Sequence, residues 1–304
     1  MKTVAIIANR KHKKAVELKL KLSKILPDTF RIYDKLTDRQ GHATSLTLEA
    51  INENVDFIIA AGGDGTMNEV INGLMQSTEE QRNKVIVGLF PLGTGNDFAR
   101  TANFNKSVDR LADLIVSEKN RKIDVGFVEF CDRNGDKKNR YFNNIAEVGV
   151  GAKATEIVNR SKKTLGSTLT FLLGVVRAFG GYKQQTVKIN ATDLQWAGKI
   201  VAVCIANGQY FGSGLGIAPG AKLDDGKLSM VIVGKITILQ FLRYLPHLRN
   251  LKLINHPEVH YLKIDFCEIT SEEKYPIEMD GESIGFTPFT AKVVPGAVNL
   301  LGEG

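Results

Sequence analysis

An apolar strand that ends in two glycines is the feature that most limits how this chain can fold. Residues 55–61 read Val-Asp-Phe-Ile-Ile-Ala-Ala and lead into Gly62 and Gly63, and helical spacing follows from Thr66 to Met75. A run that is apolar at successive positions is typical of a strand buried on both faces, as in a parallel sheet covered by helices. A strand, a glycine turn and a helix in this order predict one step of a βαβ fold.

The same alternation occupies about the first 125 residues. Strands are predicted at 4–8, 30–33, 55–61 and 85–90, and helices at 15–26, 42–54, 66–75 and 96–102. In such an architecture, ligands bind beyond the carboxyl ends of the strands. The sequence therefore predicts an α/β N-terminal domain over residues 1–124, with a Rossmann-like parallel sheet and a nucleotide at its strand ends.

The pattern changes from about Ile123, where strands follow one another at short spacing. They are predicted at 123–130, 141–148, 186–189, 199–207, 227–233, 259–266, 275–279 and 289–294, with helices only at about 152–179 and 238–254. Many short strands separated by turns are typical of a sandwich or barrel. We expect a mostly antiparallel β-sandwich as the second domain, over residues 125–284, with a C-terminal segment of about 285–304 that packs back onto the first domain.

Composition limits the kinds of partner and the cellular compartment that are expected for this chain. The net charge of +7 favours an anionic partner, although a solvated basic face would give the same value. No apolar run reaches the ~18 residues of a membrane span, and the apolar stretch before Arg10 is too short for a signal peptide. Cys131, Cys204 and Cys267 show no metal-binding spacing and are expected to be reduced thiols. These features predict a cytoplasmic protein.

The segment Gly62-Gly63-Asp64-Gly65-Thr66 provides the first chemical signal. Glycines allow the backbone to approach phosphate oxygens and offer amide donors to them. Thr66 is expected to cap the following helix, whose N-terminus attracts anions. Asp64 supplies a carboxylate for a metal on the phosphates. The structural alternative is a strand-to-helix turn that only needs glycines.

A second glycine segment, residues 91–100, reads Pro-Leu-Gly-Thr-Gly-Asn-Asp-Phe-Ala-Arg and also follows a predicted strand. Two such loops at neighbouring strand ends could hold one nucleotide between them, although two coincidental glycine turns would look the same. Far downstream, Met279-Asp280-Gly281-Glu282 is a hairpin signal. It also carries two carboxylates, one of which could take a proton from a substrate hydroxyl.

These segments together resemble one family. GGDGTMNE, PLGTGNDFAR, Arg121-Lys122-Ile123-Asp124-Val125-Gly126 and MDGE, in this order and spacing, are similar to the bacterial diacylglycerol kinase catalytic family, which is related to the sphingosine and ceramide kinases. The resemblance covers nearly the whole chain. GGDGT alone is shared with NAD kinases, so the resemblance also implies an NAD-kinase-like first domain.

The resemblance implies roles for individual residues. ATP would be the phosphate donor, Mg²⁺ its cation, and the hydroxyl of diacylglycerol or a related lipid the acceptor. Asp64, Asp97 and Asp124 would organise the catalytic Mg²⁺, and Glu282 would be the general base, supported by Asp280. The implied nucleotide contacts are Asn9, Thr37, Gly62, Gly63, Asp64, Gly65, Thr66, Asn68, Glu69, Gly93, Thr94, Gly95 and Asn96.

The resemblance also implies a second, structural Mg²⁺ in the turn at 222–227. Its ligands would be the Asp225 carboxylate and the carbonyls of Lys222 and Lys227, where the alternative is an ordinary acidic turn. Lys14 and Lys163 are basic residues placed to meet phosphate or lipid. The loop after the first strand departs from the family, because it lacks the proline and glycine of the usual Asn-Pro-x-Ser-Gly turn.

The implied reaction is in-line transfer in a cleft between the two domains, at a membrane surface that the enzyme contacts peripherally from the cytoplasmic side. A homodimer is possible, and nucleic acid is not an expected partner. Two other functions stay open: an NAD kinase, which PLGTGNDFAR and MDGE fit poorly, and a non-catalytic nucleotide-binding or nucleic-acid-binding protein. The latter would leave the acidic residues without purpose, since carboxylates repel nucleic-acid phosphates.

Overall fold

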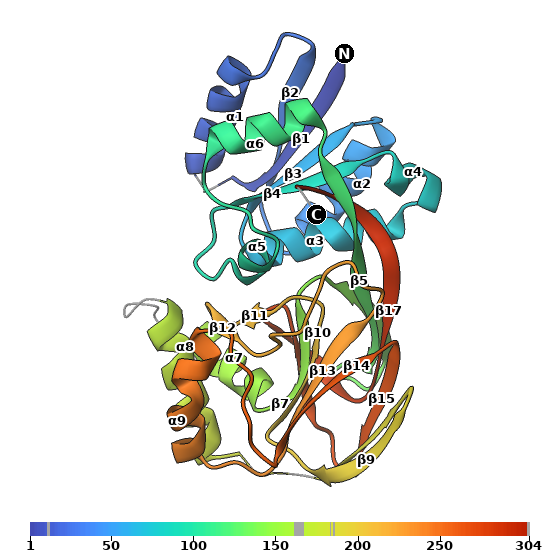
Figure 1. Cartoon of the computed structure of the whole chain (residues 1–304). Helices are drawn as coiled ribbons and strands as arrows, with labels where there is room; N and C mark the ends of the chain where they lie inside the picture. The colour runs from blue at the N-terminus through green and yellow to red at the C-terminus, as the bar shows by residue number, and fades with distance from the viewer. Residues whose placement is uncertain (11–12, 161–166, 183, 185, 303–304) are drawn as a thin grey trace. The chain divides into compact units, whose positions relative to one another are not determined.

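The chain forms two compact units, which Figure 1 shows in a colour ramp along the sequence. The computed structural model describes residues 1–10, 13–160, 167–182, 184 and 186–302. Unit 1 comprises Met1–Ile123 and Gly296–Gly304, and unit 2 comprises Asp124–Pro295. The C-terminal return to unit 1 therefore begins later than the sequence predicts, because the residues just after 285 pair with strands of unit 2.

Unit 1 alternates strands and helices, as the sequence predicts. Its elements are β1 (Lys2–Asn9), α1 (Lys13–Ile25), β2 (Phe30–Thr37), α2 (His42–Asn52), β3 (Phe57–Gly62), α3 (Asp64–Gln76), α4 (Glu79–Asn83), β4 (Ile86–Pro91), α5 (Asp97–Thr101), α6 (Val108–Ser117), the start of β5 (Asn120–Cys131) and the end of β17 (Glu282–Leu301).

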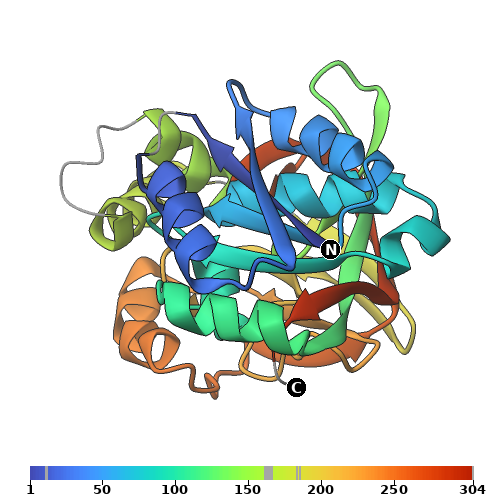
Figure 2. The same ribbon diagram turned by 90° about the horizontal axis from the view of Figure 1, so that it is seen from above.

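All strand pairs of the unit 1 sheet are parallel, in the order β17-β4-β3-β1-β2. The chain runs from β1 to β2 at one edge and then continues on the other side of β1 with β3. This reversal is a topological switch point, outside which open α/β sheets bind their ligands. Helices α1 and α6 lie side by side on one face of the sheet, and α2 and α3 cover the other (Figures 1 and 2).

Unit 2 is mainly built from antiparallel strands. Its elements are the remainder of β5 and β17, together with β6 (Lys137–Phe142), β7 (Ile145–Gly149), α7 (Val150–Arg160), α8 (Ser167–Gly180), β8 (Thr186–Ala191), β9 (Leu194–Lys199), β10 (Ala202–Ala206), β11 (Tyr210–Phe211), β12 (Leu215–Gly216), β13 (Leu228–Val233), α9 (Ile238–Arg249), β14 (Val259–Ile264), β15 (Phe266–Ser271) and β16 (Pro276–Met279).

Two cores stabilise unit 2, one on each face of the strand row β14-β13-β10-β7-β16. On one face, Val203, Val148 and Ile277 pack in a core that also contains Ile189 and Ile269 from β8 and β15. The opposite face of the row lies under the helices. There Cys204 and Val231 belong to a core to which α7, α8 and α9 contribute; these helices gather on one side of the unit (Figure 1).

The predicted fold class is confirmed: a parallel α/β domain is followed by a mostly antiparallel β-sandwich. One predicted strand, 141–148, is divided into β6 and β7. The division occurs because the backbone of Asn143 and Asn144 bonds to distant partners, Asp280 and Asn207, instead of continuing a ladder. Among the described residues, no helix has the length and hydropathy to cross a bilayer.

Candidate active site

The two glycine loops of unit 1 pack directly against each other. They follow β3 and β4, which are adjacent and parallel, with Gly62 opposite Pro91. A Cβ atom on Gly93 would lie 2.5 Å from the Cα of Gly63, and one on Gly63 would lie 3.0 Å from the Cα of Gly93. Only glycine fits this approach, so the predicted pairing of the loops holds within unit 1.

Asp64 and Asp97 lie at the starts of the helices that follow these loops. The N–H of Phe98 donates to Oδ1 of Asp64 at 3.0 Å, which ties the first loop to α5. Asp97 is the first residue of α5 and is buried. Asn96 precedes it in a left-handed conformation with φ of 54°, and its amide donates to the carbonyl of Gly93 at 2.7 Å. The carboxylates thus accompany two helix N-termini, where anions are favoured.

The predicted N-cap at Thr66 is wrong. Helix α3 begins at Asp64, with Gly63 as its N-cap residue and no side-chain cap. Thr66 is the third residue of the helix, and its side chain packs so closely on Gly62 that a Cβ on Gly62 would collide with it. The glycine turn is shorter than expected, because Asp64 and Gly65 already have helical conformation.

Asn9 and Thr37 lie at the carboxyl ends of β1 and β2, where they are register partners. They therefore share a sheet edge with the glycine loops, beside the switch point. Lys14 is exposed at the start of α1. Lys163, the other predicted basic contact, lies outside the described residues.

Two residues on α3 that are predicted to contact nucleotide also bond within the protein. Both carboxylate oxygens of Glu69 accept backbone N–H bonds, from Gly41 at 2.8 Å and from Ala43 at 2.9 Å. Glu69 thereby satisfies amides at the N-terminus of α2, which has no side-chain cap of its own. Asn68 is buried, and its side-chain oxygen accepts a bond from Asn72.

In unit 2, the predicted catalytic hairpin is present and firmly attached. Asp280 and Gly281 have φ of 46° and 91°, as in a type I′ turn, and join β16 to β17. The Asp280 carboxylate accepts the N–H groups of Asn143 at 3.2 Å and Ile145 at 2.8 Å. The N–H of Asp280 donates back to the carbonyl of Ile145 at 3.0 Å. Asp280 therefore fixes the position of the turn that carries Glu282.

Glu282 remains accessible beside one cation. Its side chain is 29% exposed, and Arg140 of β6 pairs with it at 2.6 Å between Nη1 and Oε2. Such a partly exposed carboxylate can accept a proton from a hydroxyl group of a substrate that reaches it.

Asp124 contacts the turn that was predicted to hold the second metal. Its carboxylate accepts the N–H of Gly226 at 2.7 Å, and its own N–H donates to the carbonyl of Leu223 at 2.5 Å. Within that turn, Asp225 forms an ion pair of 2.6 Å with Lys263. Among the described residues, no group of three or more His, Cys, Asp or Glu side chains is placed to hold a metal ion.

Two further carboxyls, Glu147 and Glu278, are buried side by side. They are register partners on β7 and β16. Burial, more than any neighbouring charge, raises the pKa of Glu147 to about 7 and raises that of Glu278 well above its ordinary value. Glu147 accepts the N–H of Gly151 at 2.6 Å, and Glu278 accepts that of Gly281 in the Asp280–Gly281 turn.

Comparison with known proteins assigns both parts of the chain to known domain families. Residues 3–128 match the diacylglycerol kinase catalytic domain, and residues 144–302 match the YegS C-terminal NAD kinase beta sandwich-like domain. A relative from Chromohalobacter salexigens, named probable lipid kinase YegS-like, is 30% identical over 97% of this chain and 91% of its own length. The chain belongs to the YegS-like lipid kinase family.

Two further proteins, a relative and a solved structure, are similar to this lipid kinase over most of its length. A diacylglycerol kinase from Staphylococcus haemolyticus is 30% identical over 83% of this chain and 72% of its own length. The crystal structure of a Bacillus anthracis protein assigned as a diacylglycerol kinase superposes with a TM-score of 0.77. It is 27% identical and covers 99% of this chain and 97% of that one. A kinase of this family uses ATP as its phosphate donor.

Sequence reasoning missed the residues that position the Asp280–Gly281 turn of this lipid kinase. Arg140, Asn143 and Glu278 belong to no glycine motif, and their partners lie more than a hundred residues away or within the turn itself. Glu147 did carry a signal, because a lone acidic residue interrupts the apolar strand Ile-Ala-Glu-Val-Gly.

Proposed function

We propose that this protein transfers the γ-phosphate of ATP to the hydroxyl of diacylglycerol or a closely related lipid, giving phosphatidic acid or its analogue. Membership of the lipid kinase family supports the reaction class. The observation that carries the proposal is the Asp280–Gly281 turn, which presents a partly exposed Glu282 while Asp280 holds the turn in place.

The nucleotide site belongs to unit 1 in this proposal. Backbone amides of the Gly63 and Gly93 loops contact the phosphates, and Asn9 and Thr37 lie along the same sheet edge. Asp64 and Asp97 offer the hard oxygen ligands that Mg²⁺ prefers, as does Asp124 in unit 2. Bound Mg²⁺ would neutralise charge that develops on the transferred phosphoryl group.

Glu282 acts as the general base. It accepts the proton of the lipid hydroxyl as the oxygen bonds to the γ-phosphorus, and ADP leaves with the electrons of the broken bond. Asp280 is a positioning residue, because its carboxylate bonds to backbone N–H groups of β7 rather than to substrate. Arg140 pairs with one oxygen of Glu282 and so orients the carboxylate.

The turn at 222–227 is proposed as a second Mg²⁺ site. The Asp225 carboxylate and the carbonyls of Lys222 and Lys227 are oxygen donors of the kind that Mg²⁺ takes. Lys263 already pairs with one oxygen of Asp225, so a cation there shares this carboxylate with an ammonium group.

The acceptor assay separates this function from the alternatives. The protein is incubated with γ-labelled ATP and Mg²⁺, in parallel with diacylglycerol, phosphatidylglycerol, a sphingoid base and NAD. We expect label in a lipid, with diacylglycerol as the leading acceptor. Label in NADP alone would establish an NAD kinase, and ATP binding with no label in any acceptor would favour a non-catalytic nucleotide-binding protein.

A lipid acceptor requires contact with a membrane. The net charge of +7 favours reversible binding to an anionic inner leaflet, and Lys14 is one exposed contributor. Each well-placed Lys or Arg contributes about 1 kcal/mol near such a surface. We propose that the protein associates peripherally with the membrane from the cytoplasmic side.

A further inference from the structure

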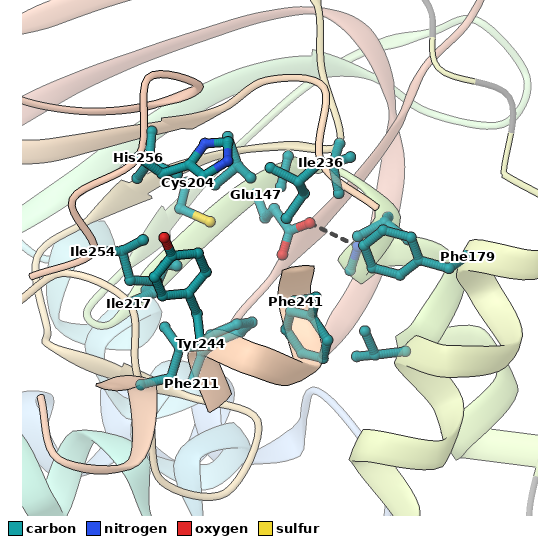
Figure 3. A pocket seen from close by; sticks show the side chains of 18 residues that line it. Glu147, Phe179, Cys204, Phe211, Ile217, Ile236, Phe241, Tyr244, Ile254 and His256 are labelled. Atoms are coloured by element: carbon teal, nitrogen blue, oxygen red, sulfur yellow. Dashed lines mark hydrogen bonds between the residues drawn. The ribbon is translucent and has the colours of Figure 1, made fainter. Parts of the chain in front are cut away.

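An apolar cavity of about 70 Å³ lies inside unit 2, between its sheet and its helices. Its floor is formed by neighbouring strands, and α8 and α9 cover it with Phe179, Phe241 and Tyr244 (Figure 3). Cavities of this kind, lined by hydrocarbon, stay dry and take up apolar molecules. The lining of the cavity therefore suits hydrocarbon better than water.

The polar groups in the cavity wall are few, and most of them are hydrogen-bonded or neutral. Glu147 accepts the N–H of Gly151, which the dashed line in Figure 3 marks. Burial raises the pKa of the Cys204 thiol far above its ordinary value, so this side chain stays neutral. Tyr244 donates its hydroxyl to the carbonyl of Asn255 at 3.4 Å.

His256, the remaining polar residue of the wall, is held through its Nδ1 atom. Nε2 lies 3.0 Å from the side-chain nitrogen of Gln240, and Nδ1 accepts the N–H of Glu258 at 3.1 Å. A polar ligand would lose its own hydration against this mostly apolar wall. The chemistry of the wall thus selects a plain hydrocarbon.

The volume limits how much hydrocarbon fits. A water-sized group needs roughly 10–15 Å³ of such space, so 70 Å³ accommodates roughly five to seven groups in a row. This corresponds to the end of one alkyl chain and not to a whole diacyl lipid.

The cavity is placed next to the catalytic turn by the order of the strands. Its floor uses Val259, Val233, Cys204 and Glu147, from β14, β13, β10 and β7. The next strand is β16, where Glu278 pairs with Glu147 and accepts a bond from the turn that bears Glu282. Glu147 therefore separates the apolar cavity from the carboxylate-rich turn.

We propose that this cavity binds the end of one hydrocarbon chain of the lipid acceptor, and that the Glu147 side chain closes it on the side of β16 and sets its length. The identification of the chain as part of the acceptor rests on the lipid kinase proposal above. Glu147 is then a specificity-determining residue, which limits chain length without touching the reacting hydroxyl.

Helix α9 shows how a membrane lipid could supply this chain. Phe241, Tyr244 and Leu248 face the cavity, whereas Leu239 and Leu242 are 75% and 40% exposed. Arg243 and Arg249 are also exposed on this helix. A helix with exposed leucines and arginines over a buried apolar cavity fits the surface of an anionic bilayer.

The binding test uses straight-chain alcohols from hexanol to dodecanol, titrated calorimetrically into the full-length protein without ATP or Mg²⁺. Each methylene buried in the cavity should tighten binding by about fourfold, which is the factor that ~0.8 kcal/mol per CH₂ gives. The increase should stop once the cavity is full. Absence of saturable binding, or affinity that keeps rising through dodecanol, would overturn the proposal.

Two cavity-filling variants test whether the alcohols bind in this cavity. Ala202→Phe and Val233→Phe, on adjacent positions of β10 and β13, should fill the cavity and weaken binding of the longest alcohols at least tenfold. The matched control is Leu239→Ala on the outer face of α9, which should bind as wild type does. Equal binding by correctly folded filled variants would contradict the site. If neither filled variant folds, the wild-type series and the Glu147 variants decide.

The alcohol length at which affinity stops rising tests the role of Glu147 separately. Glu147→Ala should move the end of the affinity increase to a longer alcohol, whereas the size-matched Glu147→Gln should leave it unchanged. If affinity stops rising at the same alcohol length in Glu147→Ala as in wild type, Glu147 does not set the chain length. Because these titrations need no phosphate transfer, binding without kinase activity would refute the proposed function alone, and kinase activity without binding would refute only the cavity.

Discussion

At the scale of single residues, the buried carboxyls of unit 2 are the least expected feature. Glu147 and Glu278 face each other across β7 and β16, and each accepts a single backbone N–H bond that the structure shows. Desolvation dominates the raised pKa of both groups, and Glu147 adds to the rise at Glu278. The protonated form of Glu147 is therefore the form that the fold stabilises.

The raised pKa of Glu147 makes the stability of the fold decrease as pH rises. A carboxyl whose folded pKa exceeds its unfolded value contributes stability that is fully present below the unfolded pKa and is lost as pH rises through the folded pKa. For Glu147 the window extends from 4.5 to about 7, which corresponds to a loss of about 3 kcal/mol.

Glu147→Gln should remove this loss. Relative to wild type, the variant should gain up to about 3 kcal/mol of unfolding free energy between about pH 5 and about pH 8.5, measured by urea denaturation. The control is Glu272→Gln, at an exposed position of the same unit, which should show no such trend. A Glu147→Gln difference that is the same at both pH values would show that Glu147 is ionised throughout.

At the scale of elements, the two glycine loops form one packed unit. Their contact at Gly63 and Gly93 leaves no room for a side chain. The loops are adjacent because β3 and β4 are parallel neighbours, which places both carboxyl ends at one edge. The shape of the predicted phosphate site is thus a consequence of strand order.

Gly93→Ala should disrupt this packing. The added methyl group would meet the Gly63 backbone, which cannot rotate away, so we expect a destabilisation of about 1–3 kcal/mol in urea denaturation. Gly65→Ala is the matched comparison, because a Cβ there meets nothing within 4 Å and the residue lies in the first turn of α3. It should be neutral or slightly stabilising. Equal losses in both variants would mean that the loops do not pack as described.

The sequence correctly predicted the elements that depend only on residues close together in the chain. The strand 55–61, its glycine turn and the hairpin at Asp280 all appear at the predicted places, because period, glycine and turn chemistry act over a few residues. Glu69 could not be predicted as a partner of α2, nor Arg140 as a partner of Glu282. These contacts join residues 26 to 28 and 142 positions apart, and they depend on how the elements pack.

At the scale of the whole molecule, charge should govern access to the acceptor. The net charge of +7 predicts binding to vesicles that contain anionic lipid, weakening as salt screens the charges. Sedimentation with anionic and with neutral vesicles, at low and at high salt, measures this dependence. Equal binding to both vesicle types, unaffected by salt, would contradict an electrostatic contribution.

Glu282 is the proposed proton acceptor in lipid phosphorylation, and transfer of γ-label from ATP to diacylglycerol tests this role directly. Wild type and the control Glu272→Gln should produce labelled phosphatidic acid at similar rates. Glu282→Gln should keep its fold but lose about 10²- to 10⁴-fold in turnover, the range for loss of a general base. Wild-type turnover in Glu282→Gln would contradict the central claim.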